Sequence, residues 1–155
     1  IASIIPRRVS TSGRPGTDST ATSAATTTLA DSLRVGIPEV DEQHRKLIVQ
    51  LDELIGDVEL MPGSERFSEL ISQLGRDLTH HFECEERAMV GIGVPHDQID
   101  AHTAAHQRIL EQYVHFNLQW IQSQPARETV LVQAREWILD HIARHDLFLR
   151  QYVAV

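Results

Sequence analysis

The sequence contains a single cysteine, Cys84, so no disulfide can form within the chain. No segment approaches the roughly 20 consecutive apolar residues that a membrane-spanning helix needs. The apolar start of the chain, residues 1–5, is shorter than a signal-peptide core of about 7–15 residues. Basic residues are few, 14 against 22 acidic ones, and the net charge of −8 argues against nucleic acid or an anionic membrane surface as a partner. The lack of a disulfide, of a membrane-spanning segment, of a signal-peptide core and of excess basic charge favours a soluble, cytoplasmic domain.

The 155 residues suffice for one domain with a substantial core and a tail. Residues 10–30 are mainly Ser, Thr and Ala, which cannot bury enough apolar surface to offset the entropy lost on folding. We therefore divide the chain into a flexible tether, residues 1–32, and a folded domain, residues 33–155. Because the sequence starts at Ile1 and not at Met, we expect a piece of a longer protein; the alternative for the tether is an expression or processing remnant.

The folded part is predicted to begin with an extended arm, residues 33–40. Apolar and polar residues alternate there, and Gly36 and Pro38 interrupt any helix. Asp41 is then expected to cap the first helix.

Four segments follow in which apolar residues recur at three- and four-residue spacing, as on one face of a helix. The second is predicted over about 64–90, the third follows Pro95 and closes at residues 123–125, and the fourth ends near Asp146. Strand signals are absent. Helices of this length with short loops predict an all-α fold, an up-down-up-down antiparallel four-helix bundle with an extended N-terminal arm.

The second predicted helix carries the stretch His81-Phe82-Glu83-Cys84-Glu85-Glu86. His81 and Glu85 are four residues apart, so they share one helix face, and that face is the apolar stripe. A carboxylate aimed at the core costs several kcal/mol unless it is paired or binds a metal. This helix therefore requires partners from the rest of the bundle.

The other predicted helices supply such partners on their own apolar faces. A single inward histidine is more often an ordinary core residue than a ligand. Several together with two carboxylates are different, because each buried imidazole needs partners for both nitrogens and each carboxylate needs cations. We therefore predict a metal site, in preference to a purely structural cluster, formed by His44, His81, Glu85, His102, His106, His141 and Asp146.

The ligand types restrict the metal. Imidazole and carboxylate without clustered thiolates suit iron, copper, nickel or zinc and disfavour an iron–sulfur cluster. Seven ligands exceed what one tetrahedral zinc can use, whereas two metals bridged by carboxylates fit the number. Asp146 lies five residues after His141, about 140° around a continuous helix, so we expect the helix to open there and the aspartate to bridge the pair.

These motifs resemble the hemerythrin family. The match extends over residues 33–155, and the segment Val35-Gly-Ile-Pro-Glu-Val-Asp41 resembles its bacterial branch. The matching motifs are Asp-Glu-Gln-His ending at His44, His-Phe-x-x-Glu-Glu at residues 81–86, His102-x-x-x-His106 and His141-Ile-x-x-x-Asp146.

The resemblance implies two non-haem iron ions, joined by an oxo or hydroxo bridge, that bind O2 reversibly. By position, His102, His106 and His141 would hold one iron, His44 and His81 the other, and Glu85 and Asp146 would bridge them. The second iron would keep an open position for O2. Trp137 and Ile138, one turn before His141 on the inner face, are candidates for lining the O2 pocket.

The remaining polar residues near these motifs are expected outside the ligand set. His80 points about 100° away from its neighbour His81, and His96 is expected in a surface loop. His145 is expected to contact a neighbouring helix or the bridging aspartate. Cys84 fits a small half-buried residue better than a redox-sensing thiol, and Glu86 is assigned to the periphery.

We therefore expect an O2 carrier, or the O2- or redox-sensing domain of a larger signalling protein such as one in chemotaxis, and not an enzyme. The expected partners are O2 and an upstream receptor or signalling domain, with no nucleic acid and no membrane contact by this segment. The alternatives are a di-iron oxidase, a peroxidase, a nitric-oxide-handling enzyme or an iron store. The sequence has no Glu-x-x-His pair of the kind that ferritin-like oxidases use.

Overall fold

The structure, a computed structural model, describes residues 32–57, 59–60, 63–123 and 127–153. Long helices dominate these residues, and no strand occurs among them. The helices are α2 (Pro38–Gly56), α3 (Glu65–Gly91), α4 (His96–Ser123) and α5 (Arg127–His141), followed by a π-helical turn η1 (Ile142–Asp146) and a 3-10 turn η2 (Leu147–Gln151). None of the helices in this part of the chain has the length and apolarity needed to cross a membrane. The predicted tether, apart from Ser32, lies outside the described residues.

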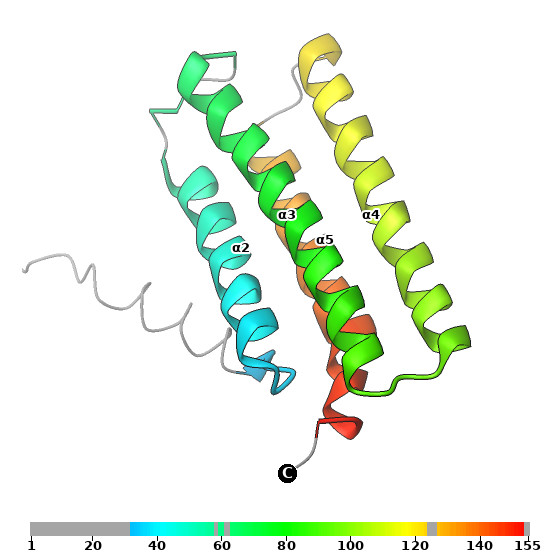
Figure 1. Cartoon of the computed structure of the whole chain (residues 1–155). Helices are drawn as coiled ribbons and strands as arrows, with labels where there is room; N and C mark the ends of the chain where they lie inside the picture. Colours follow the sequence, from blue (N-terminus) through cyan, green and yellow to red (C-terminus); the bar gives the residue numbers. More distant parts are fainter. Residues whose placement is uncertain (1–31, 58, 61–62, 124–126, 154–155) are drawn as a thin grey trace, which may run out of the picture.

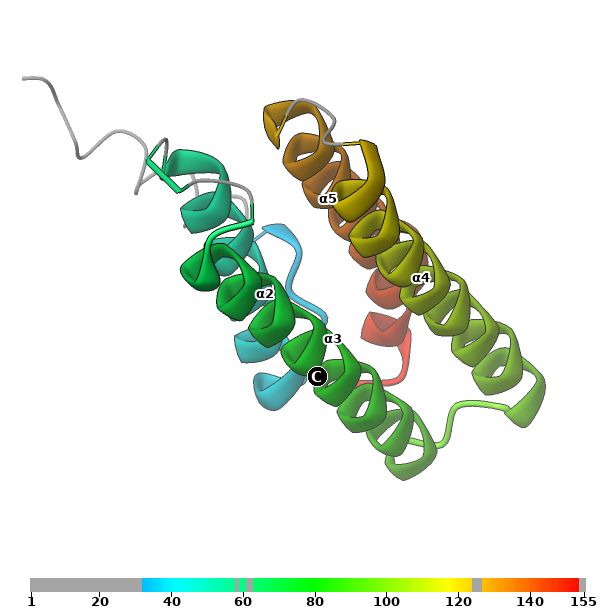
Figure 2. The ribbon, with the colours of Figure 1, turned by 90° about the horizontal axis from the view of Figure 1, so that it is seen from above.

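The four long helices run alternately up and down and form the predicted antiparallel bundle (Figure 1). Helix α2 packs against α3 and α5, and α3 packs against α4. From above, α2 and α3 lie along one side of the bundle and α4 and α5 along the other (Figure 2). The starts of α2 and α4 and the ends of α3 and α5 therefore meet at one end of the molecule.

Local features of the sequence mark the two ends of α3. The Ser64 side chain caps α3 by accepting a hydrogen bond from the Phe67 backbone N–H at 3.2 Å. At the other end, Gly93 adopts a φ of 79°, which glycine tolerates best. The chain can therefore reverse into α4 within a few residues.

The predicted start of the first helix was wrong. Helix α2 begins at Pro38, because proline has the φ of a helix and lacks the N–H that would be unpaired in the first turn. Asp41 lies inside this first turn and does not cap the helix. Its carboxylate accepts hydrogen bonds from the backbone N–H groups of Val35 at 2.6 Å and Gly36 at 3.1 Å, so it anchors the arm.

The N-terminal arm, now residues 32–37, packs across the bundle as predicted. Leu33 and Val35 are buried. The Arg150 side chain of η2 donates hydrogen bonds to the backbone carbonyls of Arg34 at 2.6 Å and Ser32 at 3.0 Å. The arm is therefore fastened to α2 by Asp41 and to η2 by Arg150.

The buried apolar residues form two clusters. The main cluster fills the bundle and includes Leu51, Leu78 and Ile109. The end cluster consists of Val35, Val40, Met89, Val94 and Leu149, beside the arm and η2. The buried polar side chains of the bundle lie where these two clusters approach each other, and Leu147 packs against both clusters.

Truncating a residue of the main cluster should destabilise the fold. Leu51 is 0% exposed, so Leu51→Ala leaves a cavity and should lower the free energy of unfolding by about 2–5 kcal/mol in denaturant titrations of the metal-free protein. Leu118, on α4, is 50% exposed, and Leu118→Ala should cost less than about 1 kcal/mol. Equal losses in the two variants would contradict the assigned core.

Candidate metal centre

Polar side chains occupy the layer between the two apolar clusters. On α2, His44 lies between Val40 of the end cluster and Leu47 of the main cluster. On α3, Glu85 lies between Phe82 and Met89 of the same two clusters. Because the helices are antiparallel, early residues of α2 and α4 meet late residues of α3 and α5 at this level. The buried polar residues of the described chain are His44, His81, Glu85, His102, His106, His141 and Asp146.

The histidines turn the same ring nitrogen, Nε2, toward the two carboxylates. The Nε2 atoms of His102 and His106 each lie 3.2 Å from Oε2 of Glu85. The Nε2 atom of His44 lies 3.2 Å from Oδ2 of Asp146, and that of His141 lies 3.1 Å from Oδ1. Two donors bound at right angles to one ion, each about 2.1 Å away, are about 3 Å apart. These separations are therefore those of ligands that share an ion.

The donor atoms fall into two groups that have the carboxylates in common. Atoms of Glu85, His102, His106, His141 and Asp146 lie within 4.8 Å of one another, and so do atoms of His44, His81, Glu85 and Asp146. Glu85 and Asp146 belong to both groups, as expected for carboxylates that bridge two ions. The structure thus brings together all seven residues predicted as ligands.

The end of α5 brings Asp146 into this layer. After His141 the α-helix gives way to the π-helical turn η1, in which hydrogen bonds run to the fifth residue and not the fourth. The wider turn places Asp146 next to His141 instead of about 140° away from it. The predicted opening of the helix at this point is confirmed.

The protonation states suit metal ligands. Burial and the anion of Asp146 would raise the pKa of Glu85, but the hydrogen bond from His102 and the close imidazole of His106 lower it to about 2. Burial would also raise the pKa of Asp146, but the close imidazoles of His141 and His44 hold it well below its usual range. Both carboxylates are therefore ionised at neutral pH, as metal ligands must be.

The imidazoles respond to the same environment. Burial lowers the pKa of His81 to about 3, against the opposing attraction of Glu85, so the ring is neutral and can offer a lone pair. Burial would lower the pKa of His102 as well, but the hydrogen bond to Glu85 and the charges of Glu85 and Asp146 raise it. The two carboxylates thus draw positive charge into the layer, which a metal ion would supply.

Several inward-facing atoms have no hydrogen-bond partner. In the described part of the chain these buried atoms include both ring nitrogens of His44, Nε2 of His106 and of His141, Oε1 of Glu85 and both carboxylate oxygens of Asp146. Each unpaired buried polar atom costs about 1–3 kcal/mol, so they are rare in folded proteins. A pair of cations would satisfy these atoms together, apart from Nδ1 of His44, which lies on the far side of its ring from Asp146. The donor set therefore fits two metal ions.

Aromatic rings pack directly on the histidines. The Phe82 ring is stacked on His106 with centroids 3.9 Å apart and lies 5.7 Å from the ring of His141. The Phe148 ring lies 5.7 Å from that of His102. The sequence interpretation assigned no role to Phe82, because helical spacing does not show which ring stacks on a residue of another helix.

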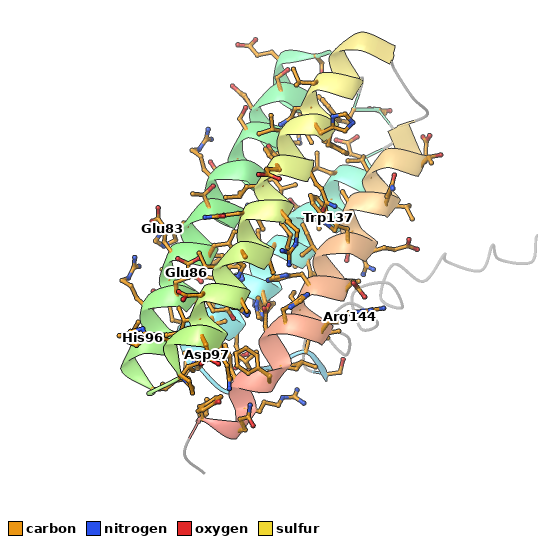
Figure 3. All side chains as sticks on the ribbon, turned by 90° about the vertical axis from the view of Figure 1, so that its right-hand side faces the viewer. Glu83, Glu86, His96, Asp97, Trp137 and Arg144 are labelled. Carbon is orange, nitrogen blue, oxygen red and sulfur yellow. The ribbon has the colours of Figure 1, made fainter. Side chains whose placement is uncertain are left out.

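The sequence had made Trp137 and Ile138 candidates for lining a pocket for O2 beside the metal site. Ile138 is buried in the main cluster, and Trp137 is half-buried against that cluster on α5, toward the middle of the bundle (Figure 3). Among the described residues, no ring contact joins Trp137 to a candidate ligand. Of the two residues, Ile138 is therefore the more deeply buried.

The outer nitrogens of two histidines have partners that the sequence interpretation overlooked. The Nδ1 atom of His106 lies 2.9 Å from Oε1 of Glu86, a residue that had been assigned to the periphery. The Nδ1 atom of His81 lies 3.2 Å from Oε1 of Gln43. Both contacts join neighbouring helices, so no spacing within one helix could reveal them.

The other histidines and the cysteine stay outside the ligand groups. His80, His96 and His115 are exposed, although His96 begins α4 and does not lie in the predicted loop. His145 is partly buried and its ring is stacked on His141, with centroids 5.1 Å apart. Cys84 is buried, and its Sγ lies 3.5 Å from Nε2 of His80 and accepts a hydrogen bond from the Arg87 guanidinium at 3.0 Å.

The chain is similar to known proteins over most of its length. The family model described as Hemerythrin HHE cation binding domain matches residues 35–150. A protein named bacteriohemerythrin from Stenotrophomonas maltophilia (strain R551-3) is 24% identical over 117 residues, which make up 75% of this chain and 74% of that protein. No solved structure gives a significant match.

Metal content should depend on the inward histidines and not on the exposed ones. The purified protein, loaded with ferrous iron under anaerobic conditions, should hold about two ions per chain by elemental analysis. His106→Ala removes one inward donor and should lower the content to one ion or less, whereas His96→Ala changes an exposed histidine and should leave it unchanged. A His106→Ala variant that folds and retains two ions would contradict the assigned centre.

Proposed function

The chain belongs to the hemerythrin family, and from this premise we propose that it binds O2 reversibly at two non-haem iron ions held between the two apolar clusters. The observation that carries the proposal is the pair of donor groups that share Glu85 and Asp146. Imidazole and carboxylate donors without clustered thiolates suit iron, and a pair of bridged positions accommodates two ions. When bound, ferrous iron supplies the electrons for reversible O2 binding.

The two donor groups suggest different roles for the two positions. One group contains three histidines, His102, His106 and His141, beside the shared carboxylates, and the other contains His44 and His81. An ion in the second group has fewer protein ligands and keeps room for an external molecule. We therefore assign O2 binding to the position next to His44 and His81.

Burial of the centre supports reversible binding. His81 is 1% exposed, Glu85 is 0% exposed and Phe82, which touches the histidines, is 3% exposed. Such an apolar enclosure excludes bulk water, so protons that would drive the release of reduced oxygen species reach the site slowly. The side chains hold the ions, and the enclosure keeps the bound gas from reacting further.

The types of donor residue favour an O2-binding protein over an oxidase. Ferritin-like di-iron oxidases hold their metals with carboxylate-rich sets that include Glu-x-x-His pairs. Here five of the seven donor residues are histidines, and Glu85 and Asp146 are the two carboxylates. We therefore propose that the protein binds and releases O2 without turning it over, in preference to an oxidase, a peroxidase, a nitric-oxide-handling enzyme or an iron store.

Optical spectra of the iron-loaded protein test this function directly. The reduced protein should be nearly colourless, gain a visible charge-transfer band when O2 is added, and return to the first spectrum when O2 is removed under argon. The cycle should repeat several times at constant iron content. Irreversible bleaching, steady consumption of O2 in the presence of a reductant, or no spectral change would each contradict the proposal.

A series of contacts connects the metal centre to the N-terminal arm, as a sensing role would require. Asp146 is followed at once by η2, and Arg150 of η2 donates hydrogen bonds to the carbonyls of Ser32 and Arg34 in the arm. A shift of Asp146 on O2 binding would therefore be passed along about one turn of helix to the arm. We propose that the domain reports O2 through this arm to a receptor or signalling domain that precedes it.

Trypsin can detect such a shift, because the carbonyl that accepts from Arg150 belongs to the cleavable bond after Arg34. Arg150→Ala should speed cleavage at this bond several-fold, as followed by mass spectrometry. Arg144→Ala serves as the control, since Arg144 is exposed and pairs with Asp140, four residues earlier at the end of α5 (Figure 3). A sensor should show different cleavage rates in the reduced and oxygenated wild-type protein. Equal rates would favour a carrier.

A further inference from the structure

We propose that Glu86 and Gln43 are positioning residues that make the two metal positions unequal. The position formed by His102, His106 and His141 would bind its ion first and more tightly, because Glu86 polarises one of these ligands. This inference rests on the two-ion centre of the proposed function but not on O2 binding.

The contact between Glu86 and His106 orients a ligand and strengthens it. A carboxylate can only accept a hydrogen bond, so Nδ1 of His106, 2.9 Å from Oε1 of Glu86, carries the hydrogen. The other nitrogen, Nε2, is then left with a lone pair, and it faces Glu85 at 3.2 Å. A negatively charged partner behind an imidazole increases the basicity of the metal-facing nitrogen and holds the ring in place.

The second position has weaker support behind its histidines. Nδ1 of His81 donates to the amide oxygen of Gln43 at 3.2 Å, a longer contact with a neutral acceptor. Hydrogen bonds to charged groups are roughly twice as strong as those between neutral groups. For His44, neither ring nitrogen has a hydrogen-bond partner among the residues that the structure describes. The ligands of this position are therefore less polarised and less firmly oriented than His106.

The number of donors adds to this difference. The group around His106 offers five donor residues, whereas the group around His81 offers four. Glu86 is not a member of either group, and its side chain is 33% exposed at the surface between α3 and α4. It can therefore be changed without emptying the buried layer, and its effect on binding can be separated from the loss of a ligand.

Metal titration of the intact chain tests the inference. The metal-free protein would be titrated anaerobically with Co²⁺ against a competing chelator, with the d–d absorption bands reporting the coordination of each ion. The wild-type protein should bind two ions in separate steps. Glu86→Gln keeps the size of the side chain and replaces the charged acceptor by an amide, so it should weaken the first step by about 10- to 100-fold and shift its bands. The second step should change much less.

Two further variants separate the proposed effect from general ones. Glu83→Gln removes the same charge one turn earlier on α3, at an exposed position, and should change neither step by more than about twofold (Figure 3). Gln43→Glu places a carboxylate behind His81 and should tighten the second step. Thermal unfolding of each metal-free variant checks that the fold is retained, and Gln43→Glu decides the question if Glu86→Gln does not fold.

The possible results of these titrations distinguish failure of this inference from failure of the proposed function. The inference is overturned if Glu86→Gln leaves the first step unchanged or weakens both steps equally, if Glu83→Gln has the same effect, or if Gln43→Glu fails to tighten the second step. A protein that binds Co²⁺ in unequal steps but shows no reversible O2 spectrum with iron would retain this inference and lose the proposed function. Reversible O2 binding together with equal Co²⁺ steps would retain the proposed function and overturn this inference.

Discussion

Two buried carboxylates, Glu85 and Asp146, are the constraint on which the rest of this structure depends. Both are 0% exposed, and both stay ionised because histidines from every long helix of the bundle point at them. Unpaired, such charges cost several kcal/mol each. The arrangement is therefore one that a pair of cations completes, and the helices, the terminal turn and the surrounding aromatic rings all serve to hold it.

The layered interior follows from this constraint. Apolar clusters on either side of the polar layer hold the helices together, and the Phe82 ring packs directly on a histidine of the layer. Because the helices are antiparallel, the starts of α2 and α4 lie at the same level as the ends of α3 and α5. The π-helical turn after His141 then brings Asp146 into this level. A regular α-helix would have turned that carboxylate away, because its residues advance by about 100° each.

Family membership and geometry lead independently to the same chemistry. The match over residues 35–150 identifies a cation-binding domain of the hemerythrin family, and the donor groups show where two cations fit. Outside the donors, further contacts surround the centre. Glu86 and Gln43 stand behind different histidines, and Arg150 ties the arm to the turn that follows Asp146. These outer contacts are where the properties of the centre can be adjusted without replacing a ligand.

The sequence by itself determined the helices, their order and the seven inward polar side chains. Helical periodicity decides which residues share a face, and the burial cost of His81 and Glu85 demands partners, so both inferences need only the order of residues. Tertiary structure alone decided the stacking of Phe82 on His106 and the partners of the outer ring nitrogens of His81 and His106. Each of these depends on distances between side chains of different segments, and a periodic pattern within one helix carries no information about those distances.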